Sequence, residues 1–191
     1  MKHKYLIAPL ALLPMFAFAH PQGHADSLLL GFSHPWVGMD HLLAMLAVGM
    51  LAAAQADLKT KVILMLCFLL SLIAGVYAPV PVNLLTSVEY IVALSVGLLG
   101  LSLLITPRLP SAICNFVVIA SGLLHGIVHG AEIPNNSQSD SFVVGMLLAS
   151  IVLHLGGFIW FSWGVKRALP YFRFACAACL SVSSAILMLH I

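Results

Sequence analysis

Histidine and carboxylate side chains gather in two short stretches of an otherwise strongly apolar chain. Within a helix, His34 and His41 are two turns apart and share nearly one face, with Asp40 beside them. His125 and His129 are one turn apart, a spacing that suits two imidazoles on one metal ion. Both stretches therefore predict one cation site near the outer surface. The residues of this site are His34, Asp40, His41, His125, His129 and, at its mouth, Glu132.

Two further ionisable residues, Glu89 and His154, lie inside apolar segments. An acid or base at the centre of a membrane helix costs at least about 2.5–3.5 kcal/mol and marks function by default. Taken singly, each residue is also explained as a structural side chain that hydrogen-bonds a neighbouring helix. Together with the two stretches, they predict a longer cation pathway.

The donor types restrict the metal. Imidazole with carboxylate suits Ni²⁺, Co²⁺, Zn²⁺ or Cu²⁺ far better than Mg²⁺ or Ca²⁺, which prefer oxygen ligands alone. The four cysteines are expected in the opposite half of the molecule, so thiolates do not contribute. Cys176 and Cys179 have redox-motif spacing but begin an apolar segment, and we interpret them as packing residues.

The composition shows what kind of protein must hold these side chains. The 191 residues are 62% hydrophobic and 7% charged, against roughly 25% charged in soluble domains. So few charges cannot cover a soluble globule of this length. This excludes a soluble enzyme, a disordered chain and a nucleic-acid-binding protein, which needs a basic stripe.

Residues 1–19 have the features of a secretory signal peptide. Two lysines come first, residues 6–16 are apolar, and residues 17–19 read Ala-Phe-Ala, a typical cleavage site. The alternative is an uncleaved first membrane helix, which two prolines disfavour. Cleavage leaves residues 20–191 as a single membrane domain that begins outside the cytoplasm.

Six apolar segments of about 20 residues follow, the length that a membrane-spanning helix needs. A short interfacial helix over 27–32 is expected before them. The sequence therefore predicts an all-α polytopic membrane protein with six transmembrane helices, over 33–55, 60–78, 82–105, 111–130, 141–165 and 168–190.

The basic residues orient these spans. If the mature chain starts outside, all of its Lys and Arg fall at the inner loops 55–60, 106–110 and 166–173, with Lys61 at a helix edge. The outer loops have none, in agreement with the positive-inside rule. We therefore expect a location in the cytoplasmic (inner) membrane, with both mature termini on the periplasmic side.

Depth along the helix separates His154 from the outer residues. If its span begins at Ser141, His154 lies about 20 Å into a core of about 30 Å, past the midplane. A permeating ion needs sites that are strong enough to enter and weak enough to leave. We therefore predict a second, sparser station for the ion at His154.

At these motifs the sequence resembles the HupE/UreJ family, membrane proteins associated with hydrogenase and urease maturation. The hallmark HPxxGxDH is complete at residues 34–41, and HGxxHGxE follows at 125–132. A third stretch, LHxxG, covers 153–157, and the segment around Glu89 is also similar. The resemblance extends over nearly all of the mature chain.

This resemblance implies a secondary permease that carries Ni²⁺ inward, with Co²⁺ as the second candidate, on the motif histidines and Asp40. It implies no enzyme and no prosthetic group, the divalent cation being cargo, and a functional link to hydrogenase or urease maturation. No P-loop pattern for nucleotide binding occurs in the sequence.

Two other functions could use the same residues. An intramembrane hydrolase would hold Zn²⁺ and a water in the His/Asp cluster and would move no ion across the membrane. A b-type cytochrome would use histidine pairs as axial haem ligands and would be red when purified.

Overall fold

The computed structural model describes residues 24–134, 137, 139–167 and 171–191; the signal peptide predicted over 1–19 lies outside them. In this part of the chain the structure contains helices and no strand, so the all-α prediction is confirmed. The elements are α1 (His24–Ser33), η1 (His34–Trp36), α2 (Met39–Ala53), α3 (Leu58–Val76), η2 (Val82–Leu84), α4 (Leu85–Ile105), η3 (Thr106–Arg108), α5 (Ser111–Glu132), α6 (Ser139–Lys166) and α7 (Phe172–Met188).

By length and composition, four of these helices can cross a membrane: Leu58–Val76, Ser87–Ile105, Ser111–Glu132 and Ser139–Lys166. The segment that contains α1 and α2 makes a fifth if it is counted as one broken span. α7 is apolar but has only 17 residues. These are the helices of a multi-pass membrane protein, whereas six spans stay a prediction.

The first span differs from the single helix predicted over 33–55. The chain forms α1, η1 and then α2, with a bend of 80° at the break. Pro35 stands in the first turn of η1, and Gly38 has an extended backbone (φ −78°, ψ 114°) just before α2. Because proline cannot donate a backbone hydrogen bond, the helix is interrupted here. The short helix predicted over 27–32 is present as α1, and it packs along α6.

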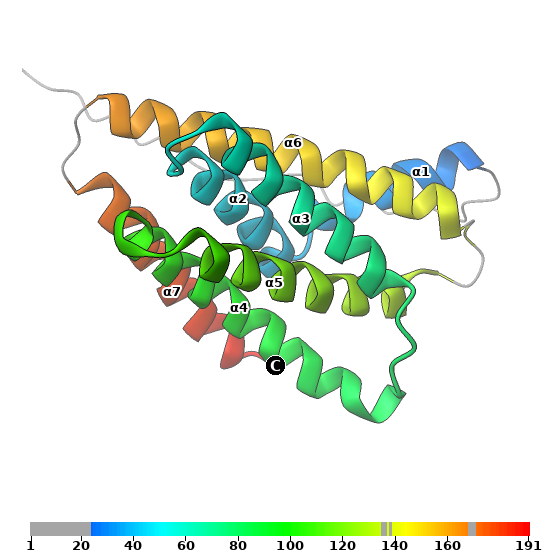
Figure 1. The fold of residues 1–191 in the computed structure, drawn as a ribbon. Helices are drawn as coiled ribbons and strands as arrows, with labels where there is room; N and C mark the ends of the chain where they lie inside the picture. Colours follow the sequence, from blue (N-terminus) through cyan, green and yellow to red (C-terminus); the bar gives the residue numbers. More distant parts are fainter. Residues whose placement is uncertain (1–23, 135–136, 138, 168–170) are drawn as a thin grey trace, which may run out of the picture.

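α2 is the central helix of the bundle (Figure 1). α1 and α2 both pack against α6, while α3 pairs with α5 and α4 with α7. α3 and α5 end, and α4 and α6 begin, at one end of the bundle. α2, α4 and α6 end, and α3, α5 and α7 begin, at the other end, and the described Lys and Arg residues lie in or next to these helix ends.

Glycines bring α3 and α5 into backbone contact. A Cβ on Gly126 would meet the Leu72 carbonyl oxygen, and one on Gly130 would meet the Val76 carbonyl oxygen. These two glycines form a small-residue face that lets the helices approach closely, and Gly122 extends it. With this face turned to α3, the histidines of α5 point toward α2.

We expect Gly126→Ala to destabilise the protein by about 1–3 kcal/mol, the usual cost of overpacking, because the backbone it meets cannot move aside alone. Thermal unfolding in detergent measures this. Gly156→Ala on α6 is the matched control, since the nearest atom to its Cβ would be the Leu46 Cδ2 at 3.8 Å. Equal melting temperatures for the two variants would contradict the packing.

Polar side chains fix both ends of α3. At its start, Asp57 accepts hydrogen bonds from the Thr60 amide (2.8 Å) and hydroxyl (2.7 Å), and these bonds lower the pKa of Asp57. Beyond its end, the Tyr77 hydroxyl donates to Asp140 Oδ1 at 3.0 Å, which raises the pKa of Tyr77. This second bond joins the α3–α4 connection to the first turn of α6.

Candidate metal site

The break between α1 and α2 positions the first three candidate ligands. His34 begins η1, and Asp40 and His41 lie in the first turn of α2. A Cβ on Gly38 would lie 2.7 Å from Cδ2 of His41 and 3.2 Å from Oδ1 of Asp40. Glycine at this position therefore leaves room for both side chains. Asp40 Oδ1 also accepts a hydrogen bond from the His41 amide at 2.9 Å.

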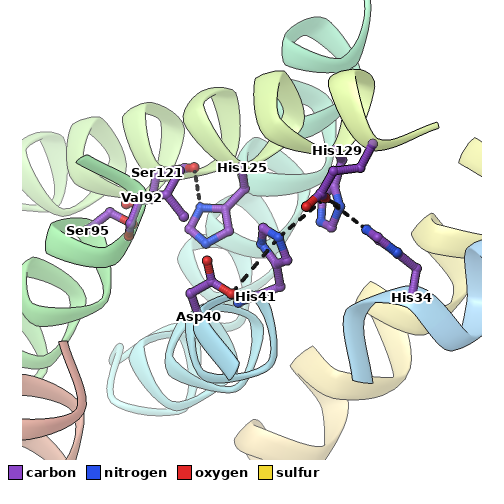
Figure 2. Close-up of polar contacts among 9 residues, drawn as sticks. His34, Asp40, His41, Val92, Ser95, Ser121, His125 and His129 are labelled. Atoms are coloured by element: carbon purple, nitrogen blue, oxygen red, sulfur yellow. Dashed lines mark hydrogen bonds and ion pairs between the residues drawn. The ribbon is translucent and has the colours of Figure 1, made fainter. Parts of the chain in front are cut away.

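α5 supplies the other half of the cluster. His125 and His129 are completely buried and lie on the side of α5 that faces α2 (Figure 2). Glu132 ends the same helix, one turn beyond His129, and its side chain is 42% exposed. The C-terminal end of a helix carries partial negative charge on its free carbonyls, which favours a cation at this position.

Three imidazoles from three elements surround one carboxylate oxygen. Oε2 of Glu132 lies 3.0 Å from Nε2 of His34, 3.6 Å from Nδ1 of His129 and 3.8 Å from Nε2 of His41. One ligand atom from each of His34, His129 and Glu132 lies within 4.8 Å of the other two. Glu132, expected at the mouth, is therefore at the centre of this group.

His125 extends the group toward the interior. Its Nδ1–H donates to the Ser121 carbonyl oxygen at 2.8 Å, which leaves Nε2 as the nitrogen with a free lone pair. That Nε2 is buried and has no hydrogen-bond partner among the described residues. The ring centroids of His125 and His41 are 5.2 Å apart, so His41 links His125 to the Glu132 group.

A cavity of about 320 Å³ opens beside the cluster. Glu89, which is exposed on α4, lies in its wall together with Asp40 and Glu132. The structure thus places the two acids predicted from separate spans, Asp40 and Glu89, around one opening. The complete lining is His34, Val37, Gly38, Asp40, His41, Glu89, Val128, Glu132 and Ile191.

His154 lies apart from this cluster. It is buried on α6, and neither ring nitrogen has a hydrogen-bond partner in the part of the chain that the structure describes. The described ring contacts join His154 to Phe68 (5.1 Å between centroids) and to none of the clustered histidines. Phe68 also contacts the His125 ring at 6.0 Å. Phe68 on α3 therefore contacts both the cluster, through His125, and His154.

Comparison with known proteins gives the family of this chain. A sequence model of the family described as HupE / UreJ protein matches residues 8–187, which is nearly the whole chain. The chain belongs to the HupE/UreJ family. Protein HupE of Rhizobium leguminosarum bv. viciae is 36% identical over 159 residues, which cover 82% of this chain and 83% of that protein. No solved structure matches the chain.

The HupE/UreJ family is associated with nickel and cobalt transport and with the nickel handling of hydrogenase and urease. This confirms the resemblance drawn from the motifs and does not favour the intramembrane hydrolase. All eight residues predicted for the cation pathway lie in described helices, seven around the cluster and its cavity and His154 beyond Phe68.

Two residues near the cluster of this HupE/UreJ protein were not predicted. Ser121 could have been found, because it precedes His125 by one turn and its carbonyl oxygen is therefore within reach. Phe68 could not be recognised from the sequence, because it is one apolar residue among many in α3. The cysteines are free thiols, and Cys114 contacts Gln55 just beyond the end of α2, away from the first turn that holds His41.

Proposed function

We propose that this HupE/UreJ protein is a secondary permease that carries Ni²⁺, with Co²⁺ as the second candidate, inward across the cytoplasmic membrane. The observation that carries the proposal is the meeting of three imidazoles at the Glu132 carboxylate inside a bundle of apolar helices. Such a site can attract a divalent cation and replace part of its hydration shell with protein ligands. It can then release the ion toward the other side of the membrane.

The donor set fits the proposed cargo. Imidazole nitrogens suit nickel and cobalt, and the carboxylates of Glu132 and Asp40 offset the double charge of the ion. The charge arrangement agrees with this, because α5 ends at the cluster and directs its negative end toward it. We assign His34, His41, His129 and Glu132 as the principal ligands, and His125 and Asp40 as their neighbours.

We propose that ions enter through the cavity and leave by way of His154. Glu89 on the cavity wall would attract the hydrated cation before it reaches Glu132. His154 offers one imidazole with two unpartnered nitrogens, which makes a weaker station than the outer cluster. The Phe68 ring contacts both His125 and His154, so an ion that moves from the cluster to His154 must pass this ring or displace it.

The proposed direction rests on the charges at the two ends. Exposed Lys and Arg residues are found at the end opposite the cluster, which the positive-inside rule assigns to the cytoplasm. The cluster then faces the periplasm, the side from which nickel is supplied. We propose, in keeping with the sequence prediction, that both termini of the mature chain are on the periplasmic side.

The haem alternative conflicts with the geometry. The rings of His41 and His129 are 4.0 Å apart between centroids, so a macrocycle cannot lie between them. His34 and His129 are also in contact, at 5.0 Å. Histidines packed this closely suit a single small ion.

Uptake of radioactive ⁶³Ni by membrane vesicles tests the proposed transport. We expect time-dependent uptake that Co²⁺ competes with effectively and Mg²⁺ does not, because the donors include several nitrogens. Zn²⁺ and Cu²⁺ should be tested in the same way to rank the cargo. Tightly bound metal without flux in sealed vesicles would contradict a permease.

A further inference from the structure

Basic and aromatic side chains surround the end of α6 that lies farthest from the metal site. Three cations, one each from α3, the end of α6 and the first turn of α7, lie over aromatic rings of α6 and form what we call the basic collar. The pairs, with distances to the ring centroid, are Lys61 over Phe158 (5.8 Å), Arg167 over Trp163 (4.3 Å) and Arg173 over Phe161 (5.8 Å).

The basic collar forms no ion pair with the acids that the structure describes. Among the residues that the structure describes, the ion pairs join histidines to acids, and none involves Lys61, Arg167 or Arg173. Asp57, the acid closest in sequence to Lys61, already accepts two hydrogen bonds from Thr60. The collar therefore has net positive charge available for an anion.

Arg173 points to a specific anion contact. Arg173 is half-buried, and its buried Nη1 has no hydrogen-bond acceptor among the described residues. A buried polar donor without an acceptor is costly, and more so when it is charged. Guanidinium groups match phosphate oxygens with paired hydrogen bonds, so a phosphate would remove this cost.

The neighbouring aromatic residues indicate that the collar lies at the headgroup level of the membrane. Trp160 and Trp163 are each 50% exposed on the last turns of α6, and Tyr171 just before α7 is 78% exposed. Tryptophan and tyrosine are enriched where membrane helices meet the headgroups. The phosphates at this level belong to phospholipids.

We propose that the basic collar binds the phosphate groups of anionic phospholipids, with Arg173 as the specific contact. Lys61 and Arg167 add attraction that a zwitterionic headgroup, with its own positive charge, satisfies less well. This site is distinct from the metal cluster and does not depend on which ion is carried.

Native mass spectrometry of the full chain in neutral detergent tests the proposal. The protein is titrated with phosphatidylglycerol or with phosphatidylcholine of the same acyl chains, and bound lipids are counted. We expect phosphatidylglycerol to bind more tightly. We also expect Arg173→Gln to weaken it about tenfold or more, because the change removes a hydrogen bond from the guanidinium group to the lipid phosphate as well as one charge.

Arg108→Gln is the matched control, because Arg108 is an exposed cation at the same end of the bundle that lies over no described ring. We expect it to leave phosphatidylglycerol binding unchanged. Equal binding of the two lipids, or an equal loss in both variants, would overturn the proposal. If Arg173→Gln does not fold, Arg167→Gln must give the same lipid-selective loss.

A further arm separates lipid from free anion. Inorganic phosphate is added at the concentration of the bound phosphatidylglycerol, and we expect it to displace little lipid, because the acyl chains also pack against the apolar surface. Complete displacement by phosphate alone would identify a site for a soluble anion and overturn the lipid proposal.

Discussion

His129→Ala is expected to abolish both metal binding and the uptake of trace Ni²⁺. His129 is completely buried, and its Nδ1 lies 3.6 Å from the Glu132 carboxylate at the centre of the cluster. Losing residues that only orient a metal ligand lowers affinity about 10–100-fold, so losing a principal ligand should exceed that range. Calorimetry on the purified variant and ⁶³Ni flux in vesicles measure the two effects.

Two controls accompany this variant. His190→Ala removes an exposed histidine whose ring donates only to the Ile186 carbonyl oxygen, and it should leave both measurements unchanged. His129→Asn keeps a polar side chain in the buried site and therefore disturbs folding less than alanine. The amount of each variant in the membrane shows whether it folds. If the single variants His129→Ala and Asp40→Ala both keep near-normal uptake, this site is ruled out.

His154→Ala is expected to lower the rate of uptake strongly while it leaves equilibrium metal binding nearly unchanged. The reason is its separation from the cluster, with Phe68 in contact with both His154 and His125. The ion would still bind at the outer site, but its step inward would lack the next imidazole. The same pair of measurements, affinity and flux, separates this result from that of His129→Ala.

The outcome for His154 has two clear alternatives. If His154→Ala loses binding as completely as His129→Ala, the two histidines belong to one site. If neither binding nor flux changes, His154 is a structural residue. His154 is buried, so its replacement by alanine leaves a cavity that could destabilise the protein. His154→Gln is included because glutamine is polar and of similar length, and it leaves a smaller cavity.

Local spacing explains what the sequence predicted well. His125 and His129 share a face because they are one helical turn apart, and the glycines beside them fix which face turns to α3. The central position of Glu132 could not be predicted in this way. It depends on the 80° bend at Pro35 and Gly38, which brings His34 close to the end of α5.

Contacts between distant segments were outside the reach of sequence patterns. Phe68 meets His125 and His154 only because α3 packs between α5 and α6, and one Phe in an apolar helix looks like any other. The wall that Ile191 adds to the cavity likewise depends on how α7 packs against α4. The signal peptide and the six-span count stay predictions.

The break in the first span has a mechanical consequence. His34 is attached to the unit in which α1 packs on α6, whereas His129 and Glu132 belong to the unit in which α5 packs on α3. An ion held by all three would cross-link two helical units that the Tyr77–Asp140 hydrogen bond already joins at one point. Occupancy would then stiffen the whole bundle, and each release would require the two units to move apart.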